Sequence, residues 1–274
     1  MTGKIRFLLP ALSLAALAVP ATAAATAPPA QAACPAAIVI GLHGVDEPAD
    51  SARSATIAAT FSDFAVDASA FGHGSATSGN YILDPFTYPV VPRGDFTSAA
   101  GLKHLSATLD STVISLATQV VDLKAACPSA AIELAGYSLG AWIIHMALQS
   151  TSLWADIRAA EYYGDPCWYN PSGGYIGLAR FDGSDGTRVG CSAEGVYPYP
   201  DQPPSFQVQS LCIGRDPVCG QGLNPSMSPA KVIARFRLAE NCTARDHCTH
   251  LDYAGSAAAE GARFLEGEAF GNAG

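Results

Sequence analysis

A strand-to-helix junction in the middle of the chain constrains the fold most strongly. Residues 130–135 form a short apolar run, and residues 139–149 follow with apolar side chains at helical spacing. The pentapeptide GYSLG at residues 136–140 joins them, with a glycine on each side of the serine. A turn this tight needs glycine where the backbones of strand and helix approach each other. The sequence therefore predicts a buried strand that runs directly into a helix.

Strand-like runs alternate with helical ones along the chain. Residues 36–42 form a continuous apolar run typical of a fully buried strand, and residues 98–126 place Leu and Val side chains at the spacing of a long amphipathic helix. We expect further strands at residues 64–68, 85–91, 159–163 and 205–212. This alternation predicts an α/β layered domain with a mostly parallel sheet. Active sites of such domains lie beyond the carboxyl ends of the strands.

The first 33 residues have the plan of a secretory signal peptide. Lys4 and Arg6 precede an apolar run from Phe7 to Val19, and cleavage is expected near Ala32 or Ala33. The run is too short to cross a bilayer, and no later segment approaches the ~20 apolar residues of a membrane helix. The sequence thus predicts a secreted chain without a transmembrane segment, in which residues 34–274 form a single domain.

The eight cysteines all follow this segment, and their number is even. In an oxidising compartment the expectation is four disulfides, although many pairings are possible. Neighbours in the sequence favour Cys167 with Cys191, Cys212 with Cys219, and Cys242 with Cys248, which leaves Cys34 and Cys127. The segment CTARDHCTH at residues 242–250 has ligands that suit zinc. Because the cysteines close into pairs without a remainder, we expect disulfides and no metal site.

The formal charge of −9 excludes some partners. An acidic chain is poorly suited to nucleic acid or to an anionic membrane surface. Neither is expected as the main partner.

Ser138 is the candidate nucleophile, and it needs a histidine base and a carboxylate to orient that base. His145 lies about two turns along the same helix, away from the turn, so His247 and His250 are the candidate bases. The candidate acids are Asp165, at the end of a predicted strand, and Asp216, between Cys212 and Cys219. The residues alone do not choose between the two acids.

An ordered set of motifs resembles the cutinases and cutinase-like serine esterases of fungi and actinobacteria. The set consists of Cys34, Cys127-Pro128, GYSLGA at 136–141, CIGRDPVC at 212–219 and HLDY at 250–253. The resemblance implies a three-layer α/β-hydrolase fold with Ser138 as nucleophile, Asp216 as acid and His250 as base. It also implies disulfides Cys34–Cys127 and Cys212–Cys219.

Four features depart from the family pattern. Leu139 stands where the family usually has Gln, and His43-Gly44-Val45 replaces the common Arg-Gly-Ser. The backbone N–H groups of Leu139 and Val45 are therefore the expected oxyanion donors. The other departures are insertions at about residues 166–204 and 220–249, which we expect to shape the substrate groove or to form a lid over it.

These features predict a secreted, monomeric serine esterase without a cofactor. Its expected substrate is an ester, either a cutin-like polyester or a short- or medium-chain acyl ester. The alternatives are a lipase, phospholipase or acyltransferase acting on cell-envelope lipids, and a non-catalytic secreted binding domain.

Overall fold

The computed structural model describes residues 34–150, 152–166, 206–213, 216, 218–219 and 249–271. The chain divides after Ala32, and all described residues belong to the second unit, Ala33–Gly274. The predicted signal peptide and nearly all of both predicted insertions lie outside the described residues. Within the described part, no helix is long and apolar enough to cross a membrane.

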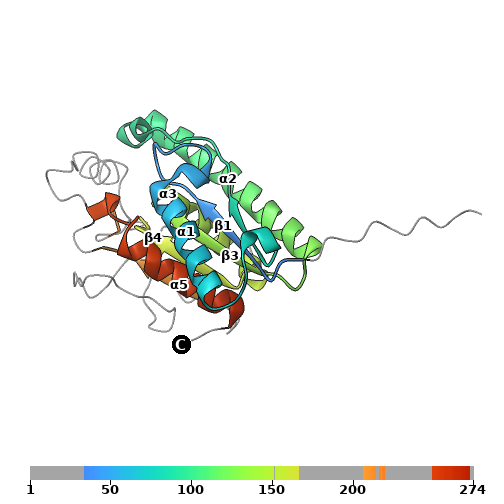
Figure 1. Cartoon of the computed structure of the whole chain (residues 1–274). Helices are drawn as coiled ribbons and strands as arrows, with labels where there is room; N and C mark the ends of the chain where they lie inside the picture. The colour runs from blue at the N-terminus through green and yellow to red at the C-terminus, as the bar shows by residue number, and fades with distance from the viewer. Residues whose placement is uncertain are drawn as a thin grey trace, which may run out of the picture. The chain divides into compact units, whose positions relative to one another are not determined.

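A parallel sheet of five strands in the order β2-β1-β3-β4-β5 forms the centre of the domain (Figure 1). The strands are β1 Ala37–Leu42, β2 Tyr81–Pro85, β3 Ala131–Tyr137, β4 Ala159–Tyr163 and β5 Gln207–Leu211. Strands β1 and β4 are buried along their whole length, because helices cover both faces of a parallel sheet. This sheet confirms the predicted α/β class.

In the described part of the chain, four α-helices flank the sheet, and short 3₁₀ turns join the elements. The α-helices are α1 Ala55–Ala70, α2 Ala99–Ala126, α3 Leu139–Ser150 and α5 Ser256–Phe270. The 3₁₀ turns are η1 Ser51–Arg53, η2 Ala76–Ser78, η3 Arg93–Thr97, η4 Ser152–Ala155 and η5 Thr249–Leu251. Helix α2 begins where the Ser98 side chain accepts from the Gly101 N–H at 3.0 Å. It ends at Cys127, which forms a disulfide with Cys34 just before β1.

The strand register shows which helices cover which face. Gly41 of β1 packs against Ile57 of α1, and Gly261 of α5 packs against Tyr163 of β4. Alternate residues of a strand point to opposite faces, so α1 and α5 share one face; they lie side by side in Figure 1. Asp84 of β2 faces the other way and accepts a hydrogen bond from α2. Helices α2 and α3 pack together, and the domain is a three-layer sandwich.

Two predicted strands are wrong. Residues 64–68 lie inside α1, where Ile57, Phe61, Phe64 and Ala68 are buried at helical spacing. The strand expected at residues 85–91 is instead β2, which ends at Pro85. Beyond Pro85 the chain forms only an isolated bridge at Thr87, because Pro89 and Pro92 cannot donate to a strand ladder.

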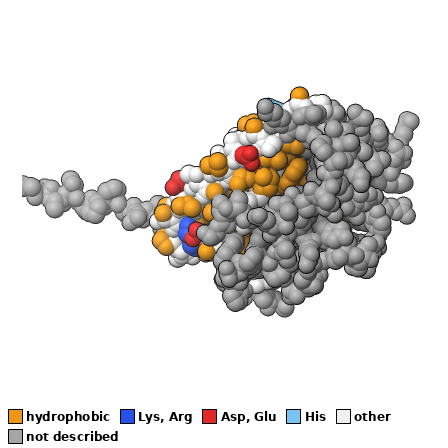
Figure 2. All heavy atoms as spheres, turned by 180° about the vertical axis from the view of Figure 1, so that it is seen from behind, with side chains coloured by type: hydrophobic (Ala, Val, Ile, Leu, Met, Phe, Trp, Pro, Cys, Tyr) orange, Lys and Arg blue, Asp and Glu red, His pale blue; other side chains and the backbone are white. Residues whose placement is uncertain are grey.

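Charged side chains are sparse on the surface. Only 14% of the residues are charged, and Figure 2 shows hydrophobic and uncharged polar groups over most of the described surface on that side. Isolated surface ion pairs stabilise a protein by at most ~1 kcal/mol. The folded state therefore depends mainly on apolar burial around the sheet.

Candidate active site

Ser138 lies on a strained turn between β3 and α3. Its φ is 53°, a left-handed conformation that only one other described non-glycine residue, Asp46, adopts. Such a conformation costs ~1 kcal/mol or more and persists only when the surroundings hold it. The Ser138 N–H donates to Tyr163 O at 2.8 Å, and Ser138 O accepts from Trp142 N–H at 3.1 Å to start the helix. These bonds hold the serine at the carboxyl edge of the sheet.

Both glycines of the pentapeptide are required by close backbone approaches. A Cβ on Gly136 would lie 2.6 Å from Ala141 N. A Cβ on Gly140 would lie 2.4 Å from Leu42 O and 2.7 Å from His43 O. The N-terminus of α3 therefore packs directly against the backbone at the end of β1.

Ser138, His250 and Asp216 form one continuous hydrogen-bonded chain. His250 Nε2 lies 2.9 Å from Ser138 Oγ, and His250 Nδ1 lies 2.8 Å from Asp216 Oδ2. All three residues are buried. A carboxylate can only accept from the ring, so Nδ1 carries a proton and a neutral His250 has a lone pair on Nε2 facing the serine hydroxyl. This arrangement suits proton transfer from Ser138.

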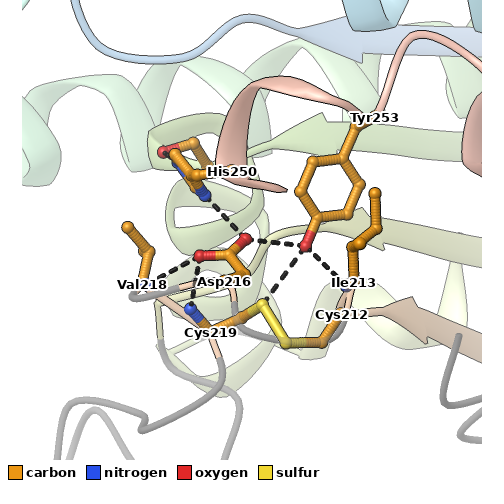
Figure 3. Close-up of a disulfide and its surroundings, with 8 residues drawn as sticks. Cys212, Ile213, Asp216, Val218, Cys219, His250 and Tyr253 are labelled. Atoms are coloured by element: carbon orange, nitrogen blue, oxygen red, sulfur yellow. Dashed lines mark hydrogen bonds and ion pairs between the residues drawn. A yellow bond between two sulfur atoms is a disulfide. The ribbon is translucent and has the colours of Figure 1, made fainter. Parts of the chain in front are cut away.

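Hydrogen bonds to both carboxylate oxygens hold Asp216 in place (Figure 3). Oδ1 accepts from the N–H groups of Val218 at 2.7 Å and Cys219 at 3.3 Å. Oδ2 accepts from the Tyr253 hydroxyl at 2.7 Å, in addition to His250. The disulfide Cys212–Cys219 closes the loop around the acid. Burial alone would raise the pKa of Asp216, but His250 and these donors outweigh it and leave the pKa below its ordinary value.

Two tyrosines fix the surroundings of His250. The Tyr137 hydroxyl donates to His250 O at 2.7 Å, and its ring stacks on the imidazole at a centroid distance of 5.4 Å. Tyr253 accepts from Ile213 N–H at 3.0 Å while donating to Asp216. Gly164, with a φ of 60°, lets the imidazole approach, because a Cβ there would lie 3.0 Å from His250 Cε1. The sequence motifs contain both tyrosines but gave no role for either.

The two candidate acids contact different histidines. Asp165 Oδ2 lies 3.2 Å from Nδ1 of His145 on α3, and this pair is buried. Asp216 contacts His250 instead. His247, the other candidate base, lies outside the described residues. His145 lies on α3, as the sequence predicts, and no pattern in the sequence indicates its contact with Asp165.

Both expected oxyanion donors lie at the junction of β1 and α3. Leu139 is the first residue of α3, where N–H groups have no partner within the helix. Val45 follows β1 by three residues, and the Gly140 contacts bring that segment against the start of α3.

The described residues contain no group of three or more His, Cys, Asp or Glu side chains that could hold a metal ion. Residues 242–248 of the CTARDHCTH segment lie outside the described part of the chain. So do Cys167 and Cys191, which leaves their pairing, and that of Cys242 with Cys248, as predictions.

The comparisons with known structures agree with the fold. The structure of Trichoderma reesei cutinase in complex with a phosphonate inhibitor matches at 19% identity with a TM-score of 0.51, covering 86% of this chain and 77% of that chain. An acetyl xylan esterase matches at 19% identity with a TM-score of 0.54, covering 86% of this chain and all of that one. At such identities the likeness establishes the fold alone. A search of curated proteins finds no significant match.

The parallel sheet, its flanking helices and the strand-serine-helix turn define a cutinase-like α/β-hydrolase fold. A match to the Cutinase family supports carboxylic-ester hydrolysis. The profile of the Cutinase family matches residues 91–231, slightly more than half of the chain. The chain belongs to the Cutinase family. The matched range includes Ser138 and Asp216, while His250 follows it.

Proposed function

We propose that the protein is a serine esterase that hydrolyses carboxylic esters through Ser138, His250 and Asp216. The observation that supports this most directly is the hydrogen-bonded chain from Ser138 Oγ through His250 to Asp216. It lies at the carboxyl edge of the sheet, where this class of fold performs its chemistry.

In the proposed reaction, Ser138 Oγ attacks the ester carbonyl while His250 Nε2 takes its proton. Asp216 keeps the proton of His250 on Nδ1 and stabilises the imidazolium that forms. The N–H groups of Leu139 and Val45 stabilise the oxyanion of the tetrahedral intermediate. His250 then protonates the leaving alcohol, and an acyl-enzyme remains on Ser138. A water molecule that loses its proton to His250 releases the acid, and no step requires a cofactor.

The proposed substrate is a cutin-like polyester or a short- or medium-chain acyl ester. The short-chain acyl esters include acetylated polysaccharide, which we add because an acetyl xylan esterase has the same fold. We also propose that the chain is secreted and monomeric, with cleavage of the signal peptide near Ala32 or Ala33.

Hydrolysis of p-nitrophenyl esters from C2 to C16 by the wild-type protein and by Ser138→Ala tests this proposal. We expect hydrolysis by the wild type and a loss of roughly 10³-fold or more in kcat for the variant. The acyl-chain preference of the wild type distinguishes the substrate groups. A wild type inactive on every ester, or a fully active Ser138→Ala, would refute the serine-esterase function.

A further inference from the structure

The loop that follows β1 uses almost all of its backbone N–H groups internally. Three of the four N–H groups in residues 43–46 donate to protein acceptors: His43 to Ser51 Oγ at 3.1 Å, Gly44 to Glu47 Oε2 at 2.5 Å, and Asp46 to Val91 O at 3.2 Å. Among the described residues, none accepts from the N–H of Val45. This N–H is therefore the one donor of the loop that remains for a ligand.

The side chain of His43 holds the carbonyl beside that donor. His43 Nδ1 lies 2.8 Å from Gly44 O. A carbonyl oxygen cannot donate, so the proton of a neutral His43 must be on Nδ1. The opposite nitrogen, Nε2, is buried and has no hydrogen-bond partner among the described residues. Burial lowers the pKa of His43 and outweighs the opposing effect of the Gly44 and Tyr88 backbone groups, so it favours the neutral ring.

The imidazole plane is fixed as well. The ring stacks on Tyr88 at a centroid distance of 3.8 Å and an interplanar angle of 4°. The Tyr88 hydroxyl also donates to His43 O, which ties the aromatic platform to the same loop. A tilt of the His43 ring would therefore lose the stack, and a 180° flip would lose the bond to Gly44 O.

The bond to Gly44 O determines where the Val45 N–H points. In a trans peptide unit the C=O and N–H groups point in opposite directions, and the unit is rigid. Gly44 O and Val45 N–H belong to the same unit, so holding the oxygen on one side directs the N–H to the other. If this peptide rotated, the carbonyl oxygen would face the oxyanion and repel it.

We propose that His43 is a positioning residue for the oxyanion hole, acting through the Gly44–Val45 peptide. The inference rests on the proposed esterase function. Val45 has no hydroxyl with which to stabilise the oxyanion or to anchor the loop, so the loop geometry depends on the buried histidine donor. His43 does not contact the substrate in this account.

Two substitutions separate the hydrogen bond from the packing. His43→Phe keeps a planar ring against Tyr88 but removes the donor, whereas His43→Asn keeps an N–H donor close to the Nδ1 position. Removing one oxyanion donor costs ~10²- to 10³-fold in kcat. Because His43→Phe misdirects the Val45 N–H without removing it, we expect a smaller fall in kcat, of about 10- to 100-fold, with KM within about twofold. We expect His43→Asn to retain kcat within about fivefold. Affinity for a trifluoromethyl ketone, which forms an oxyanion on the serine, should fall in parallel with kcat/KM.

Equal kcat for the wild type and a folded His43→Phe would overturn the inference, as would a loss confined to KM. Ser138→Ala, measured alongside, separates the two proposals. If the wild type hydrolyses esters through Ser138 and His43→Phe does so equally well, the esterase function stands and only the role of His43 fails.

If His43→Phe does not fold, nitrogen-15 NMR of the wild-type histidine rings decides the question. The inference predicts that His43 carries its proton on Nδ1 at neutral pH. A proton on Nε2 would exclude the bond to Gly44 O and refute the proposed role.

Discussion

Gly140→Ala tests the contact between the nucleophile turn and the loop after β1. The new Cβ would lie 2.4 Å from Leu42 O and 2.7 Å from His43 O. An ordinary carbon–oxygen contact is about 3.3 Å, so helix and strand must separate by roughly 0.6–0.9 Å. Overpacking of this kind costs ~1–3 kcal/mol of unfolding free energy. For a domain of this size, a cost of ~2 kcal/mol lowers Tm by about 4–8 °C.

The same displacement moves Leu139 N–H relative to the loop that carries Val45. A misplacement of ~1 Å at a reacting centre costs ~100-fold in rate, so we expect kcat to fall by about that factor. Thermal unfolding and hydrolysis of p-nitrophenyl acetate measure the two effects. Gly94→Ala is the matched control, because a Cβ at Gly94 meets no atom within 4 Å. A Gly140→Ala protein with wild-type Tm and kcat would refute the close packing on which the oxyanion hole depends.

Five further substitutions, two of them controls, test other parts of the structure. Glu133→Met should stabilise the protein increasingly as pH rises. Burial raises the folded-state pKa of Glu133 well above 4.5, so wild-type stability falls by ~1.4 kcal/mol per pH unit between 4.5 and that pKa. Tyr253→Phe should lower kcat about tenfold by removing a hydrogen bond to the Asp216 carboxylate. Tyr163→Phe should not, because its buried hydroxyl pairs with a threonine of α1. Asp216→Asn should lower kcat by about three to four orders of magnitude, and Asp165→Asn by far less.

Each of these has a simple measurement. Urea unfolding from pH 5 to pH 9 should show that the difference in unfolding free energy between the Glu133 variant and the wild type grows with pH. A constant difference would exclude a raised folded-state pKa for Glu133. Steady-state kinetics decide the other cases. Equal losses from both Tyr→Phe substitutions would exclude a specific role for Tyr253. A larger loss from Asp165→Asn than from Asp216→Asn would exclude Asp216 as the acid.

Most of the central sheet could be predicted from the sequence, because buried parallel strands are continuous apolar runs. The runs at residues 36–42 and 159–163 correspond to β1 and β4 within one residue. The prediction failed at residues 64–68, where a short apolar run fits either a strand or one face of a helix. The helical spacing of the apolar residues Ile57, Phe61, Phe64 and Ala68 would have identified this run as part of a helix. The prediction also missed α5, whose buried face consists mostly of alanine and glycine.

The candidate site was predictable where a motif carries it and hidden where it depends on contacts distant in sequence. The serine turn has a local signature in its flanking glycines. The prediction of Asp216 over Asp165 as the acid rested on the family resemblance, because both aspartates follow plausible strand ends. The bonds from Tyr253 to Asp216 and from Tyr88 to His43 O join segments 37 and 45 residues apart. No spacing rule within the sequence indicates such contacts.

The most direct test of the proposed chemistry is covalent capture of the nucleophile. A fluorophosphonate ester reacts with a serine hydroxyl that a neighbouring base activates, and peptide mass spectrometry locates the adduct. The proposed triad predicts a single adduct on Ser138, absent in Ser138→Ala and strongly suppressed in His250→Ala. An adduct on another residue, or ester hydrolysis that continues with Ser138 unmodified, would contradict it.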